Sequence, residues 1–245
     1  MPPMAWPPVT MATQHPDNAG PVWWGEKQAF VPTQDEITEL ITLFQELPID
    51  EYMWDWEGKF VDEGVGEKLF SRAGDFFAAH PLGKDFHLTY RIPAWEETKN
   101  HRTARAFMNI LSLADLGKEL KLPLPPVTEM FLPMTTKAEQ PMGALRAFRE
   151  TADYHRAVFH ESPAEEENIL SRIRVTPLVE DVDSLFSIER IVEPYWKSLP
   201  QQKDGHDGHR VFLARSDPAL NSGLVPAVLA VRSALSTVHR LGDEM

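Results

Sequence analysis

Strand-like and helix-like segments alternate along almost the whole chain, and this alternation limits the possible folds more than any other feature. Segments expected to be strands are rich in β-branched, aromatic and aliphatic residues, and they cover 50–59, 86–93, 127–133, 173–180 and 210–217. Segments with apolar residues at helical spacing separate or flank them, at 33–47, 67–79, 102–120, 145–158, 185–196 and 224–238. This order is typical of successive βαβ units on a parallel sheet.

The number of these units points to an incomplete barrel. Five strands follow a polar turn around His15, or six if that turn itself follows a short strand. A complete (β/α)8 barrel has eight units. The sequence therefore predicts an α/β fold: a partial (β/α)8 TIM-type barrel with the first five or six βα units plus extra helices.

The two ends of the chain suggest the domain organisation. Residues 1–10 contain four prolines and are expected to be a flexible Pro-rich leader. Residues 11–245 are expected to form the N-terminal part of a single TIM-barrel catalytic domain. The last helical pattern continues to Met245 with only Gly242 as a stop signal, so we interpret the domain as truncated.

Composition excludes several classes of function. The net charge of -13 and the absence of a basic run argue against a nucleic-acid partner, so an anionic substrate must meet locally placed arginines. No apolar run approaches the roughly 18 residues of a membrane span. The chain has no Cys, which excludes disulfides and thiolate zinc sites and favours a cytoplasmic location.

The stretch from Asp50 to Lys59, DEYMWDWEGK, is unusually dense in acids and aromatics. As a strand it places Met53, Asp55 and Glu57 on one face and the two Trp residues on the other. Two interpretations stay open. The stretch is either an edge strand with a solvated acidic face or the floor of an active site.

Polar residues gather at or just beyond the ends of the expected strands, where barrel enzymes place their catalytic groups. They are His15, Asp55, Glu57, Arg91, Glu180 and Asp217. Glu180 and Asp217 offer oxygen ligands that suit Mg²⁺ or Mn²⁺, but acids at these positions can also cap helices or begin their first turns. Arg91 can hold a carboxylate or phosphate bidentately, or it can be a structural ion-pair partner.

Six motifs in order make the chain similar to the archaeal-type phosphoenolpyruvate carboxylases. The motifs are ATQHPDNA (12–19), DEYMWDWEGK (50–59), LTYRIP (88–93), EMFLPMTT (129–136), TPLVEDVDSL (176–185) and LARSDPALNSGL (213–224). The resemblance covers nearly all of the chain from Met11, but only about the first half of a full family member.

The resemblance implies a carboxy-lyase that fixes CO₂ and replenishes the tricarboxylic acid cycle. Bicarbonate attacks the phosphoryl group of phosphoenolpyruvate, giving carboxyphosphate and the enolate of pyruvate. The enolate then captures the released CO₂ to form oxaloacetate, leaving phosphate. A full family member is further expected to be a cytoplasmic homotetramer that needs Mg²⁺ or Mn²⁺.

The resemblance also assigns roles to residues. Glu180 and Asp217 are expected to hold the metal, His15 to act on carboxyphosphate breakdown, and Arg91 to bind anionic oxygens. Asp55, Glu57 and Lys59 are expected at the substrate-binding rim of the site.

Two alternative functions stay open. The chain resembles only about the first half of a full family member, and this affects the activity expected of it. Because electrostatic catalysis depends on every donor, the isolated chain is expected to show no measurable carboxylation. One alternative is a non-catalytic remnant of such an enzyme. The other is a barrel glycosidase in which Trp54 or Trp56 stacks on sugar and two acids do the acid–base work.

Overall fold

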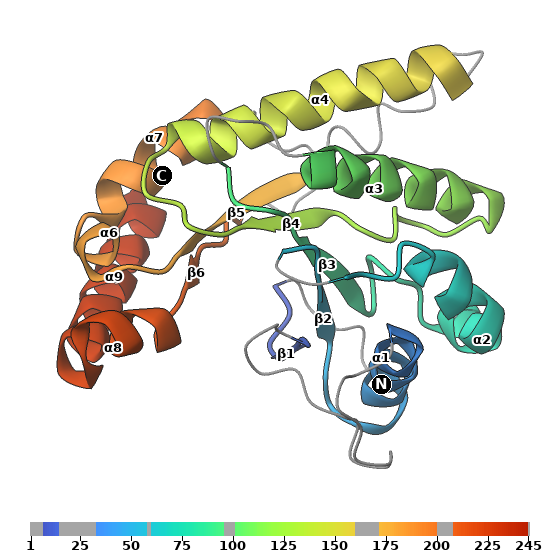
Figure 1. The fold of residues 1–245 in the computed structure, drawn as a ribbon, viewed down its shortest axis with the longest axis horizontal. Coiled ribbons are helices and arrows are strands. Elements are labelled where there is room, and N and C mark those ends of the chain that lie inside the picture. The colour runs from blue at the N-terminus through green and yellow to red at the C-terminus, as the bar shows by residue number, and fades with distance from the viewer. Residues whose placement is uncertain are drawn as a thin grey trace.

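The computed structural model describes residues 7–14, 33–57, 60–95, 101–159, 172–199 and 208–244. Six parallel strands form one curled, half-barrel sheet in sequential order, with helices around its outer side (Figure 1). The strands are β1 (Met11–Ala12), β2 (Glu51–Asp55), β3 (His87–Arg91), β4 (Glu129–Leu132), β5 (Arg174–Val179) and β6 (Phe212–Leu213). Each strand thus pairs with its neighbours in the sequence, as predicted for successive βα units.

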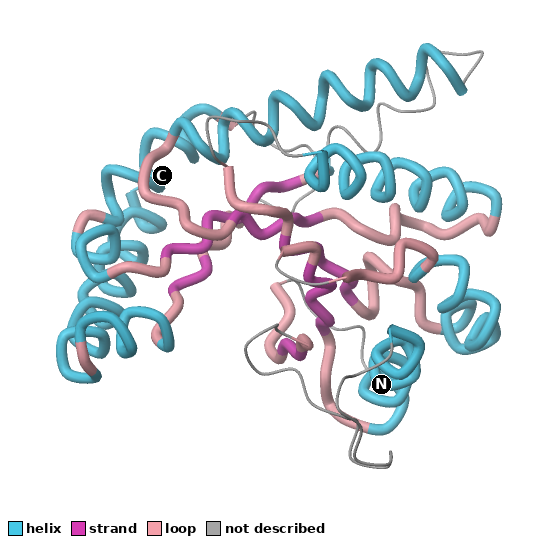
Figure 2. Tube along the Cα trace, viewed as in Figure 1, coloured by secondary structure: helices cyan, strands magenta, loops and turns pink. Residues whose placement is uncertain are grey.

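Helices follow the strands as the apolar periodicity predicted. They are α1 (Thr33–Glu46), α2 (Val65–Ala79), α3 (His101–Glu119), α4 (Glu139–Phe159), α6 (Val182–Phe186), α7 (Ile188–Ser198), α8 (Ser216–Ser222) and α9 (Leu224–Glu244). Figure 2 shows how the magenta strands form the centre and the cyan helices surround them. Among the described residues, no helix is both long and apolar enough to cross a membrane.

The two faces of the sheet have different chemistry because side chains alternate along each strand. Tyr52, Trp54 and Tyr90 point toward the helices and belong to the hydrophobic core. The opposite, inner face carries Glu51, Asp55 and other charged residues. All five residues of β2 are buried, and β2 lies between β1 and β3. The interpretation of this stretch as a solvated edge strand is therefore wrong.

The C-terminal part of the fold departs from the predicted boundaries. The helix expected over 185–196 is two helices, α6 and α7, which meet at Ser187. The strand expected over 210–217 is reduced to Phe212–Leu213, and α8 begins at Ser216. Pro218 is the third residue of α8, within its first turn, where a missing N–H costs no helical hydrogen bond. Short helices thus replace part of the expected strand.

The end of the Pro-rich segment is attached to the start of β2. Asp50 accepts hydrogen bonds from the backbone N–H groups of Val9 and Thr10 at 2.7 and 2.6 Å. The Thr10 hydroxyl also donates to Asp50 at 2.7 Å. These bonds place β1 beside β2, so that the short strand expected before His15 is present at Met11–Ala12. Residues 1–6 lie outside the described part of the chain.

Candidate functional site

Arg91 and Asp55 form a buried ion pair at the ends of neighbouring strands. The register of β2 and β3 sets these two residues opposite each other. Arg91 donates from Nε and Nη2 to the two carboxylate oxygens of Asp55, at 2.9 and 2.6 Å. Such a fork fixes the plane of the guanidinium. Arg91 therefore forms an ion pair with Asp55, and its Nη1 side is turned toward Glu57.

Glu57 lies next to this pair, just beyond the end of β2. Its Oε1 accepts a hydrogen bond from the Ala94 N–H at 3.1 Å, and its Oε2 lies 3.9 Å from Nη1 of Arg91. The Glu57 N–H in turn donates to Asp55 at 3.0 Å. Burial works to lower the pKa of Arg91, but Asp55, Glu57 and Glu180 together raise it above its ordinary value. The guanidinium is firmly cationic.

Glu180 follows β5 directly and faces the same region. Its Oε2 accepts a hydrogen bond at 2.8 Å from the N–H of Met134, a residue in the left-handed backbone conformation with φ 53°. Burial raises the pKa of Glu180, and the negative charges of Asp217 and Glu57 raise it further, against the Met134 N–H and Arg91. The helix cap is instead Asp181, whose side chain accepts from the Ser184 N–H at 2.7 Å. The alternative that Glu180 caps a helix is wrong.

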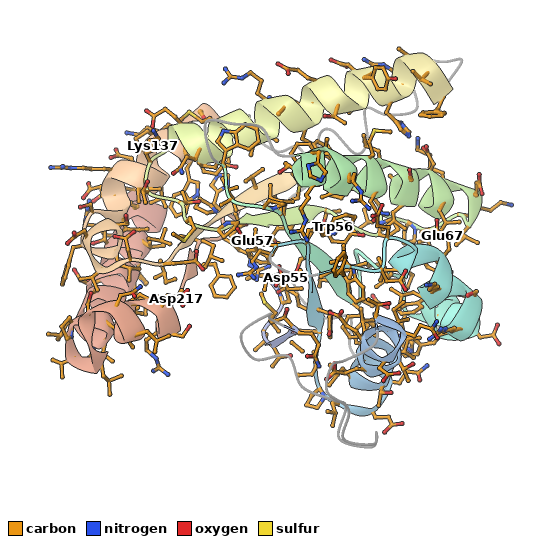
Figure 3. The ribbon with its side chains drawn as sticks, in the orientation of Figure 1. Asp55, Trp56, Glu57, Glu67, Lys137 and Asp217 are labelled. Atoms are coloured by element: carbon orange, nitrogen blue, oxygen red, sulfur yellow. The ribbon has the colours of Figure 1, made fainter. Side chains whose placement is uncertain are left out.

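Asp217 follows β6, the strand that pairs with β5. It is half-buried in the first turn of α8, so the alternative of a first-turn acid describes its local position. Figure 3 shows Asp55 and Glu57 together near the centre of the molecule and Asp217 on α8. Asp217 is nevertheless close enough to Glu180 to raise its pKa. We refer to Asp55, Glu57, Arg91, Glu180 and Asp217 as the strand-end cluster.

The strand-end cluster has the ligand chemistry of a hard cation site. Its four carboxylates offer oxygen ligands, and the pKa of Glu180 is raised first by burial and then by the negative charges of Asp217 and Glu57. Glu180 and Asp217 therefore fit a divalent cation in chemical type. Among the described residues, no group of three or more His, Asp or Glu side chains is arranged to hold a metal. His15 and Lys59, two other predicted site residues, lie outside the described residues.

Sequence reasoning missed a second charged group on the inner face, at the starts of the strands. Arg210 donates to Glu51 at 2.9 Å and to Glu129 at 2.7 Å, and its guanidinium lies 5.4 Å from the ring centroid of Phe131. Thr89 donates to Glu51 at 2.8 Å, and Thr176 donates to Glu129. Burial raises the pKa of Glu51, although Arg210 opposes this increase. We call Glu51, Glu129 and Arg210 the strand-start network.

A signal for this network was present in the sequence. Glu51 and Glu129 each stand at the start of a short apolar strand, where a charged side chain on a buried face needs a partner. The pattern does not identify that partner, because Arg210 is 159 residues away from Glu51.

The sheet is parallel and curled, and a group rich in carboxylates lies at its strand ends. These two features define the class of this protein: a barrel-like α/β protein with a candidate cation and anion site. The sequence profile of the phosphoenolpyruvate carboxylase family matches residues 8–245. The chain therefore belongs to the phosphoenolpyruvate carboxylase family.

Curated relatives carry the same family name. The chain is 34% identical to phosphoenolpyruvate carboxylase of Picrophilus torridus and 35% identical to that of Leuconostoc mesenteroides. It is also 35% identical to phosphoenolpyruvate carboxylase of Metallosphaera sedula. Each match includes 97% of this chain but only 46–47% of the relative. The chain thus spans about half the length of the curated relatives it matches.

The comparisons and the structure disfavour the glycosidase alternative. Trp54 and Trp56, the residues expected to stack on sugar, are 0% and 2% exposed. Both lie on the helix side of β2, away from the acids at the strand ends. They are core residues, and the family match points to a different chemistry.

Proposed function

We propose that this chain supplies half of the active site of a phosphoenolpyruvate carboxylase, which converts phosphoenolpyruvate and bicarbonate to oxaloacetate and phosphate. The proposal includes a (β/α)8 TIM-type barrel of which these six strands are the first part. It rests on the family membership together with one structural observation. Carboxylates from β2, β5 and α8 and the guanidinium from β3 converge at the strand ends, where such barrels carry out their chemistry.

Glu180 and Asp217 are the residues that we propose hold Mg²⁺ or Mn²⁺. Bound there, the cation would act as a Lewis acid and stabilise negative charge on the enolate oxygen. The Met134 N–H orients one Glu180 oxygen, at 2.8 Å. This bond keeps the carboxylate directed toward the strand-end cluster before any ligand arrives.

Arg91 is proposed to position the anionic substrates. Asp55 takes up its Nε and Nη2 donors, which leaves Nη1 as the donor directed away from the fork and toward Glu57. A guanidinium fixed in this way stabilises negative oxygens without reorganising. His15 is proposed to act on carboxyphosphate breakdown, and Lys59 to lie at the rim with Asp55 and Glu57.

The test is a fusion protein that supplies the missing half. The 245-residue chain is joined to the part of the Metallosphaera sedula relative that it does not match, and oxaloacetate formation is measured with phosphoenolpyruvate, bicarbonate and Mg²⁺. We expect activity in the fusion and a loss of about 10²-fold or more when Glu180→Gln and Asp217→Asn are combined. A well-folded fusion that is inactive, or one unaffected by these substitutions, contradicts the proposal.

The isolated chain provides a second test. Without the remaining half, we expect no measurable oxaloacetate formation from the purified 245-residue protein. Steady formation of oxaloacetate by this chain alone would refute that expectation. The cytoplasmic location and the homotetramer belong to the proposal for the whole enzyme, and size-exclusion chromatography of the fusion protein tests the latter.

A further inference from the structure

The loop between β4 and α4, residues 133–137, overlaps the motif EMFLPMTT and follows a strand end. Its Met134 donates a backbone N–H to Glu180 and has φ 53°, in the left-handed region. This conformation is uncommon for a residue other than glycine, and it persists only where the surrounding structure holds it. The direction of the Met134 N–H toward Glu180 therefore depends on what fixes the loop.

Thr135 fixes the middle of the loop to the sheet. It is fully buried, and its N–H donates to the carbonyl oxygen of Leu178 in β5 at 3.1 Å. Its hydroxyl donates to the carbonyl oxygen of Leu132 in β4 at 2.7 Å. Leu178 lies two residues before Glu180, so the loop is attached to the same strand that carries Glu180 at its end.

Gln140, the second residue of α4, holds the side of the loop that leads into the helix. Its Oε1 accepts hydrogen bonds from the N–H groups of Thr136 and Lys137, at 2.8 and 3.0 Å. A Gln side chain that reaches back to N–H groups at the start of its own helix forms one half of a capping box. With anchors at Thr135 and at Gln140, the loop has little freedom to turn the Met134 N–H away from its acceptor.

The amide nitrogen of Gln140 contacts two strand-end loops. Nε2 donates to the carbonyl oxygens of Met134 and Trp95 at 3.4 and 3.5 Å. These bonds are long and contribute less than the two to Oε1. Trp95 follows Ala94, whose N–H donates to Glu57 at 3.1 Å. One side chain thus connects the two loops whose N–H groups hold carboxylates of the strand-end cluster.

We propose that Gln140 is a positioning residue for the strand-end cluster. By fixing the loop it keeps the Met134 N–H directed at Glu180, and so it sets the orientation of this carboxylate before a cation binds. Groups that hydrogen-bond to a metal ligand typically contribute 10- to 100-fold to metal affinity, about the effect expected here. The effect on cation binding rests on the proposed metal site, whereas the effect on the loop does not.

The first test measures hydrogen exchange of the Met134 amide by nuclear magnetic resonance, in the purified 245-residue chain with isotope-labelled methionine. The signal is identified by its absence from Met134→Leu. Gln140→Leu removes the acceptor for the loop and should accelerate exchange of this amide about tenfold or more, because the loop opens more often. Gln140→Glu keeps an acceptor for Thr136 and Lys137, and should restore most of the protection.

The second test measures Mn²⁺ affinity of the same variants by electron paramagnetic resonance. Gln140→Leu should bind Mn²⁺ about tenfold more weakly, and Gln140→Glu should bind it like the parent. The matched control is Glu139→Gln, which changes the neighbouring exposed side chain at the same helix start and should alter neither measurement. If the parent binds no Mn²⁺, the proposed metal site fails, and the exchange of the Met134 amide decides the role of Gln140.

Two results overturn the proposal. One is an equal rate of exchange of the Met134 amide in the parent and in Gln140→Leu, since the loop would then not depend on this side chain. The other is a lower midpoint of urea denaturation for Gln140→Leu with the Mn²⁺ affinity of the parent. In that case Gln140 would only stabilise the start of α4.

Discussion

The inner face of the sheet carries two charged groups that differ in how their charges are balanced. In the strand-start network, each of the two glutamates has Arg210 and a threonine hydroxyl as donors. In the strand-end cluster, the carboxylates of Asp55, Glu57 and Glu180 act on one guanidinium, and Asp55 alone occupies two of its donors. Both groups combine carboxylates with one arginine, and β2 contributes to both.

This difference separates a structural role from a functional one. A buried charge that is fully paired and hydrogen-bonded holds the strands together, whereas removing one partner leaves a costly bare charge. At the strand ends, Asp217 and Glu57 add to the effect of burial and raise the pKa of Glu180, so these neighbouring negative charges bring no such benefit to the folded chain. Such an arrangement is understandable where a cation or a reacting group completes it. The comparison leads to four predictions.

The largest effect is expected from breaking the strand-start network. Arg210→Met leaves Glu51 and Glu129 buried without their cation, and should lower the free energy of unfolding by about 3–5 kcal/mol. Urea denaturation followed by circular dichroism measures this loss. Combining Arg210→Met with Glu51→Gln and Glu129→Gln should recover most of it. A loss below about 1 kcal/mol for Arg210→Met means that the network is not structural.

A smaller loss is expected from Arg91→Lys in the strand-end cluster. The ammonium keeps the positive charge but cannot make both bonds of the fork to Asp55, so about 1–3 kcal/mol of stability should be lost. The same urea titration applies. The matched control is Arg240→Gln, whose exposed ion pair should leave the unfolding midpoint unchanged. If Arg91→Lys behaves like this control, the fork contributes nothing to the fold.

Neutralising the proposed metal ligands should have the opposite consequence for stability. Glu180→Gln with Asp217→Asn removes mutual repulsion, so the free energy of unfolding should stay within about 1 kcal/mol of the parent or rise slightly. Mn²⁺ affinity, measured by electron paramagnetic resonance, should fall about tenfold or more. A clear loss of stability with unchanged Mn²⁺ binding would make this pair structural.

The smallest effect concerns the pH dependence that Glu51 adds. Burial raises the folded-state pKa of Glu51 above the ordinary value of 4.5, although the positive charge of Arg210 opposes this increase. Between these two values the folded chain holds a proton that the unfolded chain has released, so stability falls as the pH rises through this window. Relative to Glu51→Gln, the parent should lose stability from pH 4.5 upward and then level off. Parallel curves for the two proteins contradict the shift.

Much of the fold could be predicted from patterns within single segments. The apolar spacing of residues 33–47 identified α1, and the alternation in DEYMWDWEGK placed its acids and tryptophans on opposite faces of β2. The reduction of β6 to two residues was missed, because the apolar segment 210–217 resembles a longer strand. Ser216, Asp217 and Pro218 favour a helix start, and this local preference prevailed.

The candidate site was predictable in outline only. Strand-end positions singled out Asp55, Glu57, Arg91, Glu180 and Asp217, because parallel strands bring their carboxyl ends to one edge. The fork between Arg91 and Asp55 depends on the register of β2 and β3, which the sequence pattern does not give, and the binding of anionic oxygens by Arg91 stays a prediction. The roles of these residues in catalysis stay predictions.

The sequence by itself determined the order of strands and helices, the separation of charged and aromatic faces, and the resemblance to a carboxylase family. Those properties follow from spacing along the chain. The tertiary structure decided which charges meet: Arg210 with Glu51 and Glu129, Arg91 with Asp55, and Asp217 with Glu180. The energy of interaction between two charges falls with the distance between them and depends on how deeply they are buried. Distance and burial are set by the curl of the sheet and not by separation in sequence.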